Sequence, residues 1–185
     1  MPVSRFAVDN FKAALTGGGA RPNQFVVSLT FPAFANDGNA SNAVQFLVTA
    51  ASLPGQRIGT TNNTWYRGRE MKIAGDRVFD DWRITVINDA SMSIRRAIER
   101  WMNGINGLLD NSGYLNPFEY QANLTVTQLD RNNQELKTYI LRDCQPIDLS
   151  EISLDFSSND TVEEYQVTFS VQDFITDFDP SGVAV

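Results

Sequence analysis

The chain has 185 residues, a formal net charge of −7 at pH 7 and 42% hydrophobic residues, so it can bury a core as one domain without metal or disulfide support. It contains no His and one cysteine, Cys144. This excludes Ser-His-Asp and Cys-His catalytic sites, zinc sites of the usual Cys/His type and an internal disulfide. The acidic balance argues against a surface that grips nucleic acid.

Cys144 is expected to be a small buried apolar residue, with a reactive thiol as the alternative. The N-terminus lacks an apolar signal region, and no segment approaches the roughly 20 apolar residues of a membrane span. We therefore expect neither a secretion signal nor a membrane anchor.

The N-terminal half begins with a short amphipathic helix over Ser4 to Leu15, whose apolar face needs a surface to dock on. Gly17 to Gly19 end this helix. Alternation predicts a strand over Gln24 to Phe31. A Gly/Asn-rich loop over Pro32 to Ala43 and a strand over Val44 to Ala51 follow, and Leu53-Pro54-Gly55 ends that strand.

The middle of the chain predicts two more strands and one helix. The strands run over Trp65 to Ile73 and Asp81 to Asn88. The helix runs over Ser91 to Leu109, with candidate N-caps at Asp89, Ser91 and Ser93. Its apolar residues recur at spacings of three and four, which predicts a core-facing stripe: Ile94, Ile98, Trp101, Ile105 and Leu108.

The C-terminal half returns to strands. These are expected over Ala122 to Thr127, Leu136 to Asp143, Ile152 to Phe156 and Tyr165 to Gln172, followed by a loose tail over Asp177 to Val185. About eight strands and one helix indicate a mainly β fold, a β-sandwich or barrel whose open side is covered by the helix.

Two acidic clusters admit two readings each. Asp76, Asp80 and Asp81 fit a turn with an Asp–Arg pair better than a metal or acid/base site, because their spacing does not match a calcium loop. The second cluster fits an exposed acidic sheet face better than a glycosidase carboxylate pair; it consists of Asp148, Glu151, Asp155, Asp160, Glu163 and Glu164. Arg67 and Arg69 beside Trp65 and Tyr66 fit a strand face better than a nucleic-acid site.

One block points to a family. The segment from Ala74 to Trp82, AGDRVFDDW, followed by ITVIND over residues 84–89, closely resembles the central signature of the tail tube proteins of contractile phages. ARPNQF at residues 20–25, ASLPG at 51–55 and the C-terminal segments 146–156 and 164–171 agree in order and approximate spacing. The resemblance spans Val8 to Phe174. The loop over residues 32–43 and the tail beyond Phe174 are longer than the family's minimal version.

The resemblance implies one tail-tube domain over residues 1–185, with an N-terminal arm (1–19) and a C-terminal tail (175–185). It implies two packed antiparallel sheets with a flanking helix, and sheets that join between subunits in a hexameric ring. Stacked rings would form a hollow tube that conducts genomic DNA into the host when the sheath contracts. The chain would be a structural protein of the virion tail, assembled in the host cytoplasm, with no enzymatic activity and no cofactor.

The implied partners are further copies of the chain, the tail sheath protein, the baseplate tube-initiator, the tail terminator and passing double-stranded DNA. A turn is expected at Gly75-Asp76-Arg77, in which Arg77 pairs with the carboxylate of Asp76, Asp80 or Asp81. The signature residues are assigned to assembly: Gly75, Asp76, Arg77, Phe79, Asp81 and Trp82. A lumen that passes a polyanion should be acidic or neutral and polar. Its candidate side chains are Glu151, Ser153, Asp155, Gln166, Thr168 and Ser170. The alternative places the acidic surface on the outside, where a surrounding sheath would bind it through complementary charge.

Three other functions remain open. A baseplate tube-initiator and a type VI secretion tube subunit share the expected fold. A carbohydrate-binding β-sandwich would need Trp65, Tyr66 and Trp82 to form an exposed platform.

Overall fold

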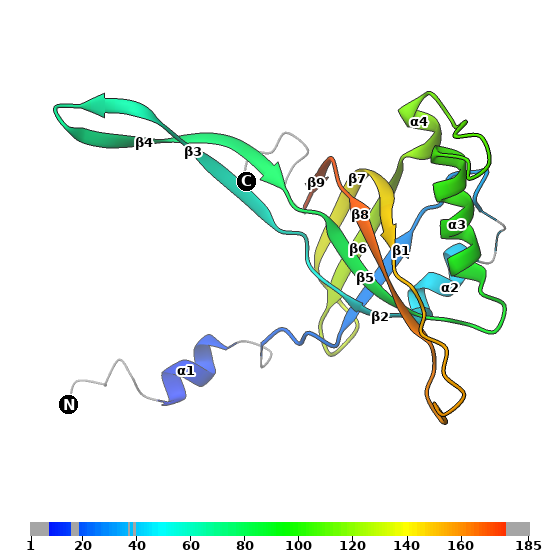
Figure 1. Ribbon diagram of the computed structural model, residues 1–185. Helices are drawn as coiled ribbons and strands as arrows, with labels where there is room; N and C mark the ends of the chain where they lie inside the picture. The colour runs from blue at the N-terminus through cyan, green and yellow to red at the C-terminus, as the bar shows by residue number, and fades with distance from the viewer. Residues whose placement is uncertain (1–7, 16–18, 37, 39, 177–185) are drawn as a thin grey trace.

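The computed structural model describes residues 8–15, 19–36, 38 and 40–176, with the backbone alone at 62–64. The described residues form four helices and nine strands (Figure 1). In chain order these are α1 Val8–Ala14, β1 Phe25–Leu29, α2 Ala40–Leu47, β2 Val48–Ala51, β3 Gln56–Tyr66, β4 Arg69–Phe79, β5 Trp82–Ile87, α3 Ser93–Ile105, α4 Pro117–Tyr120, β6 Ala122–Leu129, β7 Glu135–Leu149, β8 Glu164–Ser170 and β9 Asp173–Ile175.

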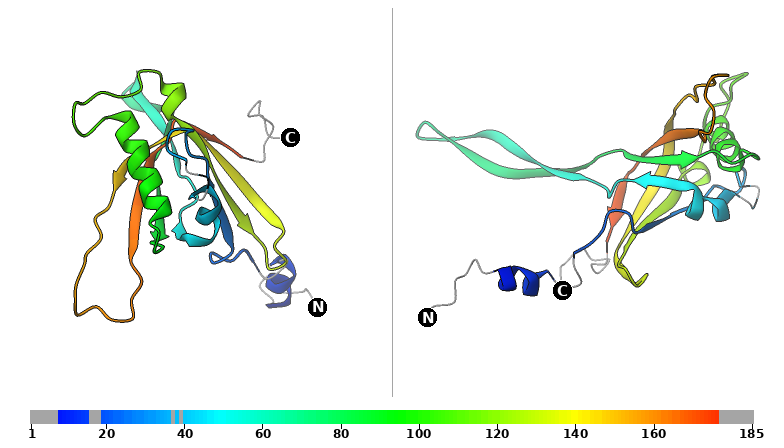
Figure 2. Two further views of the ribbon diagram at one scale, coloured as in Figure 1. Left: turned by 90° about the vertical axis from the view of Figure 1, so that its right-hand side faces the viewer. Right: turned by 90° about the horizontal axis from the view of Figure 1, so that it is seen from below.

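Seven strands form one antiparallel sheet. Six of them lie in the order β1-β6-β7-β8-β5-β2, and the seventh, β9, pairs with β7. The N-terminal part of the 15-residue β7 pairs with β6, and its C-terminal part pairs with β8. Figure 2 (left) shows β8 inclined to the β6–β7 pair, with α3 running along the side toward the viewer. The remaining strands, β3 and β4, form a separate two-stranded hairpin.

The core lies between this sheet and α3. Trp82, Ile84 and Val86 on β5 are buried, as are Tyr165, Val167 and Phe169 on β8, so the alternation of both strands places one apolar face inward. The stripe of α3 meets that face, because the rings of Trp101 and Phe169 lie 6.0 Å apart. The mainly β fold with antiparallel sheets and a flanking helix is confirmed.

The predicted stripe of α3 is confirmed for Ile94, Ile98 and Trp101, which are buried, whereas Ile105 is half-buried and Leu108 is exposed beyond the end of the helix. The N-cap of α3 is Met92 and not one of the predicted residues Asp89, Ser91 or Ser93. Asp89 still caps the helix through its side chain, because its Oδ1 accepts a 2.9 Å hydrogen bond from the Ser93 backbone N–H. Burial acts to raise the pKa of Asp89, but hydrogen bonds from Ser91 and Ser93 outweigh it and hold the pKa below its ordinary value.

Three predicted elements are wrong. Residues 40–47 form helix α2, where a loop up to Ala43 and a strand from Val44 were predicted. The helix forms because Ala40 and Val44, four residues apart, both pack against the core. Trp65 to Ile73 is not one strand: Arg67 and Gly68, both at positive φ, turn β3 back into β4. Ile152 to Phe156 has no strand partner and lies in an irregular loop between β7 and β8.

The N-terminal helix is confirmed over its described part, Val8–Ala14, and none of these seven residues is buried. Figures 1 and 2 show α1 standing away from the sheet. The rest of the predicted arm, residues 1–7 and 16–18, and the predicted tail at 177–185 lie outside the described residues.

Candidate assembly surface

The β3–β4 hairpin projects far from the body of the molecule (Figures 1 and 2). From Gln56 to Val78, every residue whose side chain is described is exposed except Gly75, which is half-buried. One face of the ribbon carries Tyr66, Met71 and Ile73, each between 48% and 62% exposed. A hairpin of this kind is marginally stable in water by itself. The apolar face therefore makes the hairpin a candidate surface for contact with another chain.

The root of the hairpin is tied to the body by aromatic and polar contacts. The Phe79 ring lies 5.3 Å from that of Phe174 in an edge-to-face arrangement. Arg57 Nη2 donates to Asp80 Oδ1 at 2.7 Å. Trp82, the first residue of β5, is 1% exposed, and its Nε1 donates to the Ser52 carbonyl at 2.6 Å. These contacts fix where the hairpin leaves the sheet.

The predicted turn at Gly75-Asp76-Arg77 is wrong, because these residues lie inside β4. Gly75 and Asp76 form a β-bulge, because both oppose the single residue Gly59. The bulge explains the glycine, since a Cβ on Gly75 would lie 3.2 Å from the Gly59 carbonyl oxygen. The predicted carboxylate partner of Arg77 is also wrong. Arg77 Nη1 donates to Gln56 Oε1 at 2.8 Å, since the β3–β4 register places Gln56 beside it.

The remaining signature residues divide between core and surface. Trp82 is buried, whereas Asp81 is exposed beside a shallow hollow that Arg83, Thr85 and Thr168 also line. Burial of Trp82 also removes it from any platform with Trp65 and Tyr66, which lie at the far end of the hairpin. The carbohydrate-binding platform is therefore ruled out.

The candidate lumen residues fall in two places. Gln166 and Thr168 lie on the face of β8 opposite the core, where they pair with Thr85 and Arg83 of β5. Gln166 is exposed, whereas Thr168 is only 7% exposed. Ser170, at the end of β8, is half-buried and pairs with Gln145. Glu151, Ser153 and Asp155 do not continue that face, because they lie in the irregular β7–β8 loop.

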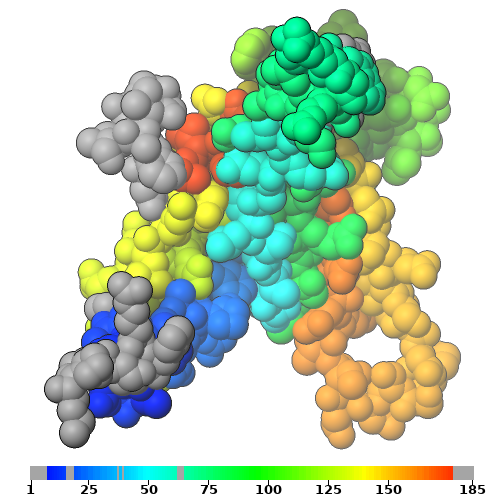
Figure 3. Space-filling model, turned by 90° about the vertical axis from the view of Figure 1, so that its left-hand side faces the viewer, coloured from blue at the N-terminus to red at the C-terminus, as the bar shows by residue number. Residues whose placement is uncertain are grey.

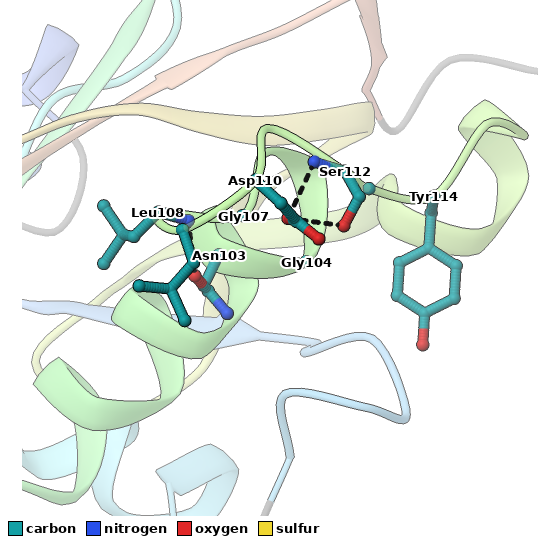
Figure 4. A pocket seen from close by; sticks show the side chains of 9 residues that line it. Asn103, Gly104, Gly107, Leu108, Asp110, Ser112 and Tyr114 are labelled. Atoms are coloured by element: carbon teal, nitrogen blue, oxygen red, sulfur yellow. Dashed lines mark hydrogen bonds between the residues drawn. The ribbon is translucent and has the colours of Figure 1, made fainter.

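A second exposed apolar region, missed by the sequence reasoning, follows α3. Leu108, Leu109, Leu115 and Phe118 are all at least 85% exposed. Beside them lies a pocket of about 400 Å³ between the end of α3 and the segment Asp110–Tyr114 (Figure 4). Its rim is shaped by Asp110, whose Oδ1 accepts hydrogen bonds from the Ser112 backbone N–H and hydroxyl.

Cys144 is fully buried and free, as predicted. Burial raises the pKa of its thiol to about 12, which argues against the reactive-thiol reading. Within the described ranges, no three His, Cys, Asp or Glu side chains gather in a way that could hold a metal ion. Among the helices described, none has the length and apolar character needed to cross a membrane.

Comparison with known proteins identifies the family. The model of the phage tail tube protein family matches residues 20–177. The tail tube protein of Serratia phage KSP90 is 31% identical over 160 residues, which cover 85% of this chain and 90% of that protein.

Two solved structures share the fold. A chain of the anti-feeding prophage baseplate, resolved with six-fold symmetry, aligns with a TM-score of 0.58 at 16% identity, over 85% of this chain and 94% of that one. A chain of the sheath–tube complex of the PVC extracellular contractile injection system aligns with a TM-score of 0.53 at 15% identity, over 89% of this chain and 95% of that one. The family match over most of the chain shows that this chain belongs to the phage tail tube protein family.

Proposed function

We propose that this tail tube protein forms closed hexameric rings that stack into the hollow tube of a contractile phage tail, through which double-stranded DNA passes. The observation that carries the proposal is the β3–β4 hairpin, which projects from the body with its apolar face uncovered by its own chain. Such a face is stabilised when another subunit covers it. The proposed role is structural, without enzymatic activity or cofactor.

The sheet edges support ring formation. β1 and β2 are the two ends of the seven-stranded sheet and offer unpaired backbone donors and acceptors. A ring in which the sheets of neighbouring subunits meet edge to edge satisfies these groups by symmetry. The same ring would have the sheath protein outside it and the baseplate initiator and tail terminator at its two ends, after assembly in the host cytoplasm.

The polar face of β5 and β8 is the best candidate for the lumen wall. Glu164 and Asp148 lie beside Gln166 and Thr168 on this face, and Arg83 is the basic residue that faces Thr168. A wall of this composition has more acidic than basic groups, which keeps a sliding polyanion hydrated.

Sedimentation velocity and negative-stain microscopy of the purified protein test the proposal. We expect rings or tubes at high protein concentration, or on co-expression with baseplate components. A species that stays strictly monomeric under both conditions would contradict it.

A tube-initiator of the baseplate is the second candidate, because a baseplate chain of the anti-feeding prophage shares the fold. The two functions differ in product: an initiator stops at a single ring, whereas a tube subunit continues to stack on it. Tube length after co-expression distinguishes them, and the same measurement applies to a type VI secretion tube subunit.

A further inference from the structure

Charge is distributed unevenly between two projecting segments. The hairpin segment Gln56–Phe79 contains five basic and two acidic residues, a net charge of +3 in a chain of −7. The β7–β8 loop, residues 150–163, contains four acidic residues and neither Lys nor Arg. Arg69 and Lys72 on the hairpin and Glu151 and Asp160 on the loop are all exposed.

Both segments also expose apolar side chains among these charges. The hairpin presents Met71 and Ile73 on the face that also carries Arg69, with Lys72 between them on the opposite face. The loop presents Leu154 and Phe156 beside Asp155. Asp155 orders the loop locally, since it accepts hydrogen bonds from the Ser157 backbone N–H at 2.9 Å and hydroxyl at 2.8 Å. The two surfaces therefore match in the two respects that a stable interface needs, apolar area and opposite charge.

These segments cannot meet within one chain. Figure 1 shows the hairpin leaving the body on one side and the loop, in orange, hanging from the other end of the sheet. Figure 3, viewed along the hairpin, shows the same separation between the hairpin at the top and the orange loop at the lower right. A contact between them requires two copies.

We infer that the β3–β4 hairpin of one copy docks on the 150–163 loop of a second copy through apolar contact framed by ion pairs. The inference rests on the proposed function and assigns one of its subunit contacts. The contact is heterologous, because different surfaces of the two copies meet, so it propagates through an assembly. Its charged rim should make assembly weaker at high salt.

A pair of charge-reversed variants tests the contact. Arg69→Glu/Lys72→Glu changes the hairpin from +3 to −1. Glu151→Lys/Ser153→Lys/Asn159→Lys/Asp160→Asn changes the loop from −4 to +1. Asn is chosen at 160 because that residue has φ 61°. The substitutions leave the Arg57–Asp80 ion pair and the Asp155 hydrogen bonds intact.

Each variant alone pairs like charges at the proposed contact, so at 150 mM salt we expect its assembled fraction in sedimentation to fall at least about tenfold. An equimolar mixture restores opposite charges at every contact between unlike subunits and should assemble as the wild type does. The control variant Arg96→Glu/Arg131→Glu makes the same charge change as the hairpin variant, at exposed positions outside both segments, and should assemble normally.

The outcomes separate the inference from the proposed function. If the wild type assembles and both variants alone assemble equally well, the docking contact is wrong while the tube function stands. Failure of the mixture to recover, although both variants show wild-type unfolding curves, also contradicts the contact. A wild type that never assembles contradicts the proposed function itself.

Discussion

The indole Nε1 of Trp82 donates a 2.6 Å hydrogen bond to the carbonyl oxygen of Ser52. Trp82 begins β5 directly after the hairpin, and Ser52 follows β2 directly before it. One buried side chain therefore joins the two chain segments that enter and leave the hairpin. This arrangement sets the direction in which the hairpin projects.

Trp82→Phe should lower the free energy of unfolding by about 1–3 kcal/mol, because it keeps an aromatic ring in the core but leaves the Ser52 carbonyl without its donor. Urea unfolding measures the change. Trp65→Phe on the exposed hairpin is the matched control and should change the unfolding free energy little. Equal effects for the two substitutions would show that the hydrogen bond does not stabilise the fold.

Trp101→Ala should cost about 3–5 kcal/mol of unfolding free energy, since the side chain is fully buried between Phe31 and Phe169. Trp65 is 67% exposed, so Trp65→Ala should leave the unfolding of the monomer within about 0.5 kcal/mol of wild type. The same Trp65→Ala change should weaken assembly, which sedimentation measures. A negligible cost at Trp101 would contradict the packing of α3.

The elements that sequence predicted well are those in which local pattern and tertiary burial agree. The spacing of Ile94, Ile98 and Trp101 identified α3, and the alternation of Tyr165, Val167 and Phe169 identified β8. The same alternation at Ile152, Leu154 and Phe156 predicted a strand that does not form. A segment with this pattern becomes a strand only where a neighbouring strand can pair with it, and no strand pairs with this one.

The hairpin was missed for a related reason. Trp65 and Tyr66 have strong strand propensity, and this masked the turn at Arg67-Gly68, whose signal was the glycine that follows a strand-like run. The signature block was recognised as a unit, yet the role of Gly75 depends on Gly59 in the facing strand. Such contacts depend on the register in which two strands pair, and the order of residues along the chain does not reveal that register.

Asp89→Ala should reduce the unfolding free energy by about 0.5–2 kcal/mol at pH 7, because it removes the side chain that accepts from the Ser93 backbone N–H. The pKa of Asp89 is lowered in the folded chain, so its stabilising effect is present above pH about 4 and is lost as pH falls below that. Urea unfolding at pH 7 and at pH 3 should show the difference between wild type and variant shrinking at the lower pH. A difference that does not depend on pH would contradict the role of the carboxylate.

Cys144 should react with a thiol reagent at pH 8 at least about 100-fold more slowly in the folded chain than in urea, since burial excludes the reagent and disfavours the thiolate. The pKa of its thiol is about 12 when folded, against about 8.5 for a free thiol. The neutral buried thiol therefore stabilises the fold fully below pH about 8.5, and this stabilisation is lost as pH rises toward 12. Rapid labelling of the folded chain would contradict the burial.

The face of β5 and β8 opposite the core offers a direct test of the lumen assignment. Thr85 and Gln166 are neutral neighbours at its centre, paired across the two strands. Arg83 Nε donates to the Thr168 hydroxyl at 3.4 Å, so its charge lies along the sheet surface beside a polar side chain. Lysines at Thr85 and Gln166 would add two cations to this face without disturbing the buried side of either strand.

Tubes assembled from Thr85→Lys/Gln166→Lys should retain double-stranded DNA that wild-type tubes do not hold. If this face lines the lumen, six copies per ring bring the added ammonium groups close to the phosphates, and counterion release then favours binding. Retention, measured by co-sedimentation of short duplexes, should fall steeply between about 50 and 200 mM salt. The control Arg96→Lys/Arg131→Lys introduces two lysines at exposed positions on other elements without changing the net charge, and should behave as wild type. Wild-type tubes that already bind duplex DNA at 150 mM salt would contradict a non-adhesive lumen, and variant tubes that bind none would place this face away from the channel.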